Sequence, residues 1–319
     1  MEAANKLNIA IVGAGAMGSL FGAYLSTSAR VVLVDTWSAH VEAINRQGLT
    51  VELPDGDSTV FPLTAMSVAD QLKAPVDVAI IFTKSADTMA ATQTAQKLLK
   101  PNGIVLTLQN GIGNIEVIQQ VIDKGRALAG VTTHGATVLG PGKVRHSGSG
   151  PTHIARPAQD LPDFEALIHT FGQAGFEITL SDDIGSLIWG KLIINVGINA
   201  LAAILRVPNG VLAEVEPTQR IMSATVLEAV LVAKALGIDL PDQHPVDRVL
   251  YACRNTATNR ASMLQDMLRG ADTEIDVING AIVRIGEALG IPTPFNRLLT
   301  DMVKALENTR SERIQAEDQ

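Results

Sequence analysis

The first half of the chain alternates short apolar runs with segments of helical periodicity. The runs are nearly continuous and rich in Val and Ile, which is typical of strands buried on both faces of a parallel sheet. Strands that alternate with helices in this way predict an α/β fold with a Rossmann-type, doubly wound parallel sheet. The predicted strands are 8–12, 30–35, 76–83, 104–108, 126–133 and 176–180, and the predicted helices are 16–26, 38–47 and one that ends at 99.

Local signals refine three of these elements. Ser38 is an expected N-cap of its helix because its hydroxyl can accept a hydrogen bond from an early backbone N–H. The segment 51–60 predicts a hairpin that turns at Pro54-Asp-Gly56. Pro101-Asn-Gly103 is expected to stop the preceding helix.

From Ile184 onward the pattern is helical almost throughout, which predicts an all-helical second domain. The polar break Ser181-Asp-Asp183 separates the two patterns. A length of 319 residues suits two domains, so we expect a dinucleotide-binding domain over 1–182 and a helical substrate-binding and catalytic domain over 183–319. The long helices predicted in the second domain are 189–204, 219–236, 245–268 and 273–289.

Composition narrows the function classes. A net charge of −8 gives no general attraction to nucleic acid or anionic lipid, and 46% hydrophobic residues argue against disorder. A single cysteine and six histidines without ligand spacing predict no metal site. The start of the chain lacks a basic leader, and the apolar stretch 9–24 carries four glycines, so we expect a cytoplasmic protein without a membrane span.

The first strand leads into Gly13-Ala-Gly-Ala-Met-Gly18 at the start of the first helix. In a dinucleotide fingerprint the first glycine permits the tight turn, the second lets the backbone approach a pyrophosphate, and the third allows close packing of helix and strand. The anion then lies at the helix N-terminus. We therefore expect cofactor contacts from Gly13, Ala14, Gly15, Ala16, Met17 and Gly18.

Asp35 ends the second predicted strand, 22 positions after Gly13. An acidic residue there can bind the adenine ribose 2′-OH of NAD, and its charge would repel a 2′-phosphate. Asp35 therefore suggests NADH, although a solvated aspartate at a strand end is the alternative.

Lys191, Asn195 and Asn199 are spaced by four residues within an otherwise apolar helix, so they lie along one face. An ammonium and two amides are costly to bury unless they are paired or used. The residues alone leave two readings equally open: a ligand site, or a snorkelling lysine with asparagines bonded to the backbone.

A series of motifs in order along the chain resembles the ketopantoate reductase (2-dehydropantoate 2-reductase) family. The resemblance extends from Ile9 to about Pro294. The motifs are Gly13 to Gly18, Phe82-Thr-Lys84-Ser, Gln109-Asn110-Gly111, Thr132-Thr-His134-Gly-Ala136, Trp189-Gly-Lys191-Leu-x-x-Asn195-x-x-x-Asn199, Pro208-Asn209-Gly210, Ser262-Met-Leu-Gln-Asp266 and Thr273-Glu274-Ile-Asp276.

The resemblance implies a Rossmann domain followed by a helical domain, and NAD(P)H-dependent reduction of 2-dehydropantoate to (R)-pantoate in pantothenate biosynthesis. Lys191 matches the catalytic lysine, and its ammonium could stabilise the developing oxyanion and act as general acid toward the C2 oxygen. Glu274 is implied near the nicotinamide ribose and Lys191; a carboxylate at a helix N-terminus is its alternative. The implied cofactor contacts are Lys84, Asn110, Ala136 and Glu274, and the implied substrate contacts are Lys191, Asn195, Asn199, Asn209, Asn259 and Ser262.

The sequence departs from the resemblance at one position. Family members that use NADPH often carry an arginine after the second strand, whereas this chain has Asp35-Thr-Trp37. NADPH is thus expected from the family and NADH from Asp35. Two alternative functions follow: an NAD-dependent dehydrogenase of another branched 2-hydroxy acid, resembling D-mandelate dehydrogenase, and a dinucleotide-binding sensor that performs no chemistry. The expected partner is a small 2-keto acid, and the apolar helices of the second half could form a homodimer interface.

Overall fold

The computed structural model describes residues 6–67 and 74–312, so the first residues, from which the absence of a leader was argued, lie outside the described part. The chain divides into two compact units. The α/β unit comprises Met1–Gln109 with Gly113–Ile184, and the helical unit comprises Asn110–Ile112 with Gly185–Gln319.

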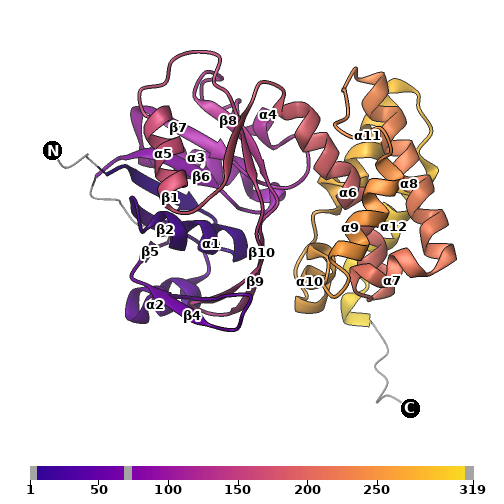
Figure 1. The fold of residues 1–319 in the computed structure, drawn as a ribbon, viewed down its shortest axis with the longest axis horizontal. Coiled ribbons are helices and arrows are strands. Elements are labelled where there is room, and N and C mark those ends of the chain that lie inside the picture. Colours follow the sequence, from indigo (N-terminus) through magenta and orange to yellow (C-terminus); the bar gives the residue numbers. More distant parts are fainter. Residues whose placement is uncertain (1–5, 68–73, 313–319) are drawn as a thin grey trace. The chain divides into compact units, whose positions relative to one another are not determined.

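The α/β unit is built on an eight-stranded sheet with the order β12-β11-β8-β7-β6-β1-β2-β5 (Figure 1). Every neighbouring pair is parallel except β8 and β11. The fold-class prediction of a mostly parallel sheet is confirmed. The strands are β1 (Asn8–Val12), β2 (Arg30–Val34), β5 (Thr64–Met66), β6 (Val76–Ile81), β7 (Leu99–Thr107), β8 (Ala127–Thr132), β11 (Thr152–Ala155) and β12 (Ile178–Ser181).

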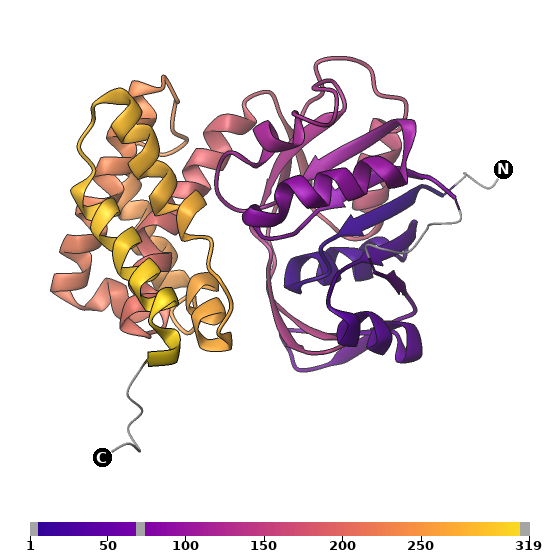
Figure 2. The same ribbon diagram turned by 180° about the vertical axis from the view of Figure 1, so that it is seen from behind.

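Helices cover both faces of this sheet, as successive residues of one strand show. Val78 and Ile80 pack in one hydrophobic cluster with α1 and α5, whereas Ala79 and Ile81 pack in another with α3 and α4. Side chains alternate between the faces of a strand, so the apolar run of β6 reflects burial on both sides. Figure 2 shows helices on both faces of the sheet. The helices are α1 (Ala16–Leu25), α2 (Ser38–Gln47), α3 (Thr88–Leu98), α4 (Asn114–Ile118) and α5 (Phe164–Gln173).

A second sheet of four strands, in the order β4-β3-β10-β9, belongs to the same unit. The predicted hairpin is present as β3 (Leu49–Glu52) and β4 (Ser58–Phe61), and Gly56 in its turn has φ 95°. The strands β9 (Gly135–Gly140) and β10 (Lys143–Gly148) were not predicted. The strand β10 pairs with β3 of the hairpin. Because the paired residues are about 90 positions apart in the sequence, no local pattern predicts this pairing.

One local prediction for this unit was wrong. Ser38 is the first residue of α2, Trp37 occupies the N-cap position, and no side chain caps the helix. The helix before Pro101-Asn-Gly103 does end there, since α3 ends at Leu98, but the strand that follows starts earlier than predicted, and these three residues form part of β7. The β6–β7 register shifts at this point, which accommodates the missing proline N–H within an irregular stretch of strand.

The helical unit contains α6 to α12. At its centre is α6, which is long and apolar enough by length and composition to cross a membrane; 61% of its most apolar window is buried, as in a core helix. The helices are α6 (Ile184–Leu205), α7 (Asn209–Glu214), α8 (Glu216–Ala235), α9 (Pro245–Asn255), α10 (Ser262–Arg269), α11 (Asn279–Leu289) and α12 (Pro294–Asn308), with a 3₁₀ turn η2 at Ile275–Val277.

Two predicted long helices are interrupted. The segment 245–268 forms α9 and α10 with a break between them, and 273–289 forms η2 and α11. The break is fixed by tertiary hydrogen bonds, in which the N–H groups of Asn209 and Gly210 donate to the carbonyls of Asn259 and Ala257. A periodic pattern cannot reveal these long-range backbone bonds.

A buried carboxylate holds two helices of this unit together. Glu228 on α8 is 8% exposed and accepts hydrogen bonds from the backbone N–H groups of Phe295 and Asn296, at 2.9 and 3.0 Å. The Asn296 amide also donates to Glu228 and to the Thr225 carbonyl. Glu228 therefore satisfies the free N–H groups at the start of α12 from another helix.

We expect Glu228→Ala to lower the free energy of unfolding by about 3 kcal/mol, because it leaves several buried donors without acceptors. Urea unfolding monitored by circular dichroism measures this loss. Glu216→Ala is the matched control, since Glu216 forms only an exposed i,i+4 pair with Arg220 worth about 0.5 kcal/mol. Equal losses in the two variants would show that Glu228 is not a structural tie.

Candidate functional site

The glycine-rich turn follows β1 in the α/β unit, and each glycine meets a different steric demand. Gly13 has φ 95°, and a Cβ there would lie 2.6 Å from the Thr83 nitrogen. A Cβ on Gly18 would overlap the Gly13 carbonyl oxygen. Gly15, in contrast, faces open space within 4 Å. Packing therefore accounts for the first and third glycines but not for the second, and this space suits the close approach of a phosphate to the start of α1.

Asp35 follows β2 and is bonded to the same turn. Its Oδ2 accepts the Ala14 N–H at 2.6 Å and its Oδ1 accepts the Trp37 N–H at 2.8 Å. The carboxylate thus fixes the turn next to the carboxyl ends of β1 and β2, where doubly wound sheets bind ligands. The sequence predicts that Asp35 lies at the end of this strand, but it does not reveal the hydrogen bonds of Asp35 to the turn.

A buried chain of hydrogen bonds, here called the relay, connects the glycine-rich turn to the β9–β10 hairpin through His40 and Ser19. The Gly142 N–H donates to Nδ1 of His40 at 2.9 Å, so Nε2 carries the proton and faces Ser19 Oγ at 3.0 Å. Ser19 Oγ in turn donates to the Ala14 carbonyl at 2.8 Å. Burial lowers the pKa of His40, which favours the neutral ring that the relay requires. Sequence reasoning missed this relay because its members are far apart in the chain.

Further polar side chains occur where β6 and β7 end. Lys84 follows β6 at the N-cap of a 3₁₀ turn, η1 (Ser85–Asp87), and is exposed. Gln109 follows β7, and its amide donates to the Thr83 carbonyl and to Thr88 Oγ1, both at 2.9 Å. In the sequence Gln109 stands out only as part of a motif, whereas in the fold its side chain joins the ends of the two strands. Ala136 lies on β9, half-buried.

In the helical unit, Lys191 and Asn195 lie on a half-buried stripe of α6, and Asn199 continues the stripe into the core at 5% exposure. Leu192, Ile193 and Val196 are buried, whereas Ile194 is half-buried. Lys191 and Asn195 thus lie at the edge of the core of this unit, and Asn199 lies within it.

Glu274 and Asn110 come together in the same unit. Glu274 is 9% exposed, and its Oε2 accepts a hydrogen bond from the Asn110 amide at 3.4 Å. The Ile112 N–H donates to the Val277 carbonyl, which anchors the Asn110 loop to η2. Burial lowers the pKa of Lys191 to about 8, against an opposing effect of the Glu274 charge, which raises it. A lysine in this range can exchange a proton near neutral pH.

The remaining implied substrate contacts form two pairs. The Asn199 amide donates to Ser262 Oγ at 3.4 Å, at the first residue of α10. The Asn209 N–H donates to the Asn259 carbonyl, and the Asn209 amide donates to Thr256. Oδ1 of Asn209 is buried without a hydrogen-bond partner.

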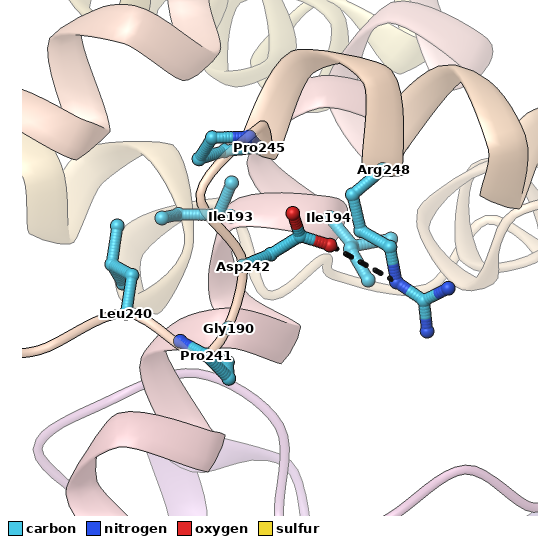
Figure 3. A pocket seen from close by; sticks show the side chains of 8 residues that line it. All are labelled: Gly190, Ile193, Ile194, Leu240, Pro241, Asp242, Pro245 and Arg248. Atoms are coloured by element: carbon cyan, nitrogen blue, oxygen red, sulfur yellow. Dashed lines mark ion pairs between the residues drawn. The ribbon is translucent and has the colours of Figure 1, made fainter.

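Two other features carry no such chemistry. Within residues 6–67 and 74–312, no group of three acidic, histidine or cysteine side chains could hold a metal ion. A small pocket beside α6 is lined mainly by apolar groups such as Ile193 and Leu240, and its two charged residues, Asp242 and Arg248, pair with each other at 4.0 Å (Figure 3). None of the predicted site residues lines it.

Comparison with known proteins identifies the family of the chain. The model of the ketopantoate reductase PanE/ApbA family matches residues 9–159, and the model of its C-terminal domain matches residues 183–307. A 2-dehydropantoate 2-reductase of Halobacterium salinarum is 35% identical over 303 residues, covering 93% of this chain and 98% of the relative. One from Pyrococcus abyssi is 36% identical over 303 residues, covering 94% and 98%.

Two solved structures are similar over nearly the whole chain. A ternary structure of D-mandelate dehydrogenase with NADH and anilino(oxo)acetate has a TM-score of 0.88 at 31% identity, covering 96% of this chain and 100% of the other. A PanE/ApbA family ketopantoate reductase from Ralstonia eutropha has a TM-score of 0.87 at 32% identity, with the same coverages of 96% and 100%. From both domain models and these relatives, the chain belongs to the ketopantoate reductase PanE/ApbA family of NAD(P)-dependent oxidoreductases.

Proposed function

We propose that the chain reduces 2-dehydropantoate to (R)-pantoate with NAD(P)H, as a cytoplasmic step of pantothenate biosynthesis. The observation that carries this proposal is the polar stripe of α6, where Lys191 with its lowered pKa lies within the electrostatic reach of Glu274. A ketone reductase needs one group that both stabilises a developing oxyanion and supplies a proton.

Each group of the helical unit has a role in this proposal. A bound dinucleotide would supply the hydride that C2 of the keto acid accepts. The Lys191 ammonium would donate a proton to the C2 oxygen, which yields the alcohol. The negative charge of Glu274 keeps enough of Lys191 protonated at neutral pH. Ser262 and the amides of Asn195, Asn199, Asn209 and Asn259 are the proposed contacts to the substrate carboxylate and hydroxyl groups.

The proposed dinucleotide site lies on the α/β unit. Gly15 leaves room for a pyrophosphate, and the residues Gly13 to Gly18 present the N-terminus of α1 toward it. Asp35 provides an acceptor for a ribose 2′-OH, and Lys84 and Ala136 are the other proposed cofactor contacts of this unit. Asn110 and Glu274, which belong to the helical unit, are the remaining proposed cofactor contacts.

For cofactor preference, we expect kcat/KM with NADH to exceed that with NADPH by about tenfold to a hundredfold, since the Asp35 carboxylate repels a 2′-phosphate by about 1–3 kcal/mol. Asp35→Asn should reduce this ratio by about tenfold, as measured by steady-state rates with both cofactors. Asp55→Asn in the exposed β3–β4 turn is the control. A wild-type preference for NADPH would contradict the proposed role of Asp35.

A second candidate substrate has its own support. D-mandelate dehydrogenase, a structural neighbour, was solved with NADH, the cofactor that Asp35 favours here. Oxidation of NADH by benzoylformate or 2-ketoisovalerate faster than by 2-dehydropantoate would assign the chain to that second class. Absence of oxidation with every keto acid, despite dinucleotide binding, would instead identify a sensor and overturn the proposed reaction.

A further inference from the structure

Trp37 is an exposed aromatic side chain in a chain with few of them. Only 3% of the residues are aromatic, and of the two tryptophans Trp189 is buried at 6% exposure, whereas Trp37 is 40% exposed. An indole that leaves this much of its surface exposed can also contact a ligand, so its position in the fold matters.

One face of the Trp37 ring is already covered. The rings of Trp37 and His40 are stacked, with centroids 4.8 Å apart and an interplanar angle of 5°. The exposed area of Trp37 therefore belongs to its other face and its edges. His40 is fully buried and is held on both ring nitrogens by Gly142 and Ser19, so the indole rests on a fixed support.

The backbone places this platform beside the proposed nucleotide site. The Trp37 N–H bonds to one oxygen of Asp35, and the other oxygen bonds to Ala14 in the glycine-rich turn. If Asp35 accepts the 2′-OH of the adenine-side ribose, the base attached to that ribose lies within a few ångströms of the Asp35 carboxylate, to which the Trp37 backbone is bonded. Bases stack readily on aromatic faces that are held in place.

We propose that Trp37 is the stacking platform for the adenine ring of the bound dinucleotide, with His40 as the positioning residue that holds the indole. This inference rests on the proposed dinucleotide function. The inference attributes part of the affinity for the adenine half of the dinucleotide to stacking on the indole ring of Trp37. It predicts that ligands containing adenosine contact Trp37, whereas ligands containing only the nicotinamide half do not.

Iodide quenching of the wild-type protein tests the platform, because iodide reaches the exposed Trp37 in preference to the buried Trp189. The difference from Trp37→Phe isolates the Trp37 signal. We expect saturating NAD⁺ or ADP-ribose to protect this signal from iodide at least twofold, and nicotinamide mononucleotide to give no protection. In calorimetry, Trp37→Ala should weaken ADP-ribose binding by about tenfold, and Trp37→Phe should recover most of it.

The possible failures are distinguishable. NAD⁺ that binds by calorimetry but leaves iodide quenching of Trp37 unchanged would overturn the platform and leave the proposed reductase function standing. Equal ADP-ribose affinity in wild type and Trp37→Ala would also overturn it. If neither NAD(H) nor NADP(H) binds the wild-type chain, the proposed function and the platform both fail. A uniform loss of thermal stability in Trp37→Ala, with ADP-ribose affinity unchanged, would assign the indole to structure alone.

Discussion

Lys191→Ala is expected to lower kcat/KM for 2-keto acid reduction by about 10³-fold to 10⁴-fold while the dissociation constant for the dinucleotide stays close to that of wild type. The loss combines general-acid catalysis with stabilisation of the oxyanion. The variant should remain folded, because burial of the Lys191 ammonium costs free energy that alanine does not incur. Steady-state kinetics together with fluorescence titration of NADH separate the two effects.

Two control variants test whether the loss of activity depends on proton donation by the Lys191 ammonium. Lys191→Arg keeps the charge but has a guanidinium that does not release a proton, so we expect it to remain largely inactive. Lys234→Ala, at the exposed end of α8, should retain wild-type rates. A Lys191→Ala enzyme within tenfold of wild type would eliminate the general-acid role.

The pKa of Lys191, lowered to about 8, also predicts the pH dependence of the reaction. Reduction requires the protonated form, so its kcat/KM should be level below pH 8 and fall tenfold per pH unit above it when proton transfer limits the rate. Oxidation of the hydroxy acid requires the neutral amine and should show the opposite trend. Glu274→Gln removes a charge that raises this pKa, so the break should move to lower pH. If the pH at which the rate begins to fall is the same in Glu274→Gln as in wild type, the Glu274 charge does not raise the pKa of Lys191.

The second large effect concerns two glycines three residues apart. We expect Gly18→Ala to lower the free energy of unfolding by more than about 3 kcal/mol, because the new methyl group overlaps the Gly13 carbonyl oxygen and α1 must move away from the turn. Gly15→Ala places the same methyl group in open space, so its stability should change by less than about 1 kcal/mol. Urea unfolding of the two variants measures the difference.

The effect on cofactor affinity should be the reverse of the effect on stability, because the variant that stays stable should lose affinity for NADH. The folded Gly15→Ala protein should bind NADH at least tenfold more weakly, since the methyl group takes the space proposed for the pyrophosphate. Isothermal titration calorimetry with NADH and with ADP-ribose measures this loss. Unchanged NADH affinity in Gly15→Ala would show that the pyrophosphate does not bind at this turn. Equal stabilities of the two variants would contradict the proposed overlap between a methyl group at Gly18 and the Gly13 carbonyl oxygen.

Most strands and helices of the fold could be predicted because they depend on local periodicity. The apolar run of β6 shows this, since burial on both faces of a parallel sheet requires apolar residues at every position. The β9–β10 hairpin and the break between α9 and α10 could not be predicted. Both depend on pairing with residues distant in sequence, such as β3 and Asn209.

By itself, the sequence determined the α/β-then-helical order, the glycine-rich turn after β1, and the polar stripe of α6, because each follows from residue types at fixed short spacings. Only the tertiary structure decided what these residues contact. It brought Asn110 to Glu274 and Asn199 to Ser262, bonded Asp35 to the glycine-rich turn, and placed Trp37 on His40. Hydrogen bonding, stacking and desolvation act over a few ångströms in space, so the partner of a side chain and the pKa of a lysine are properties of the folded chain.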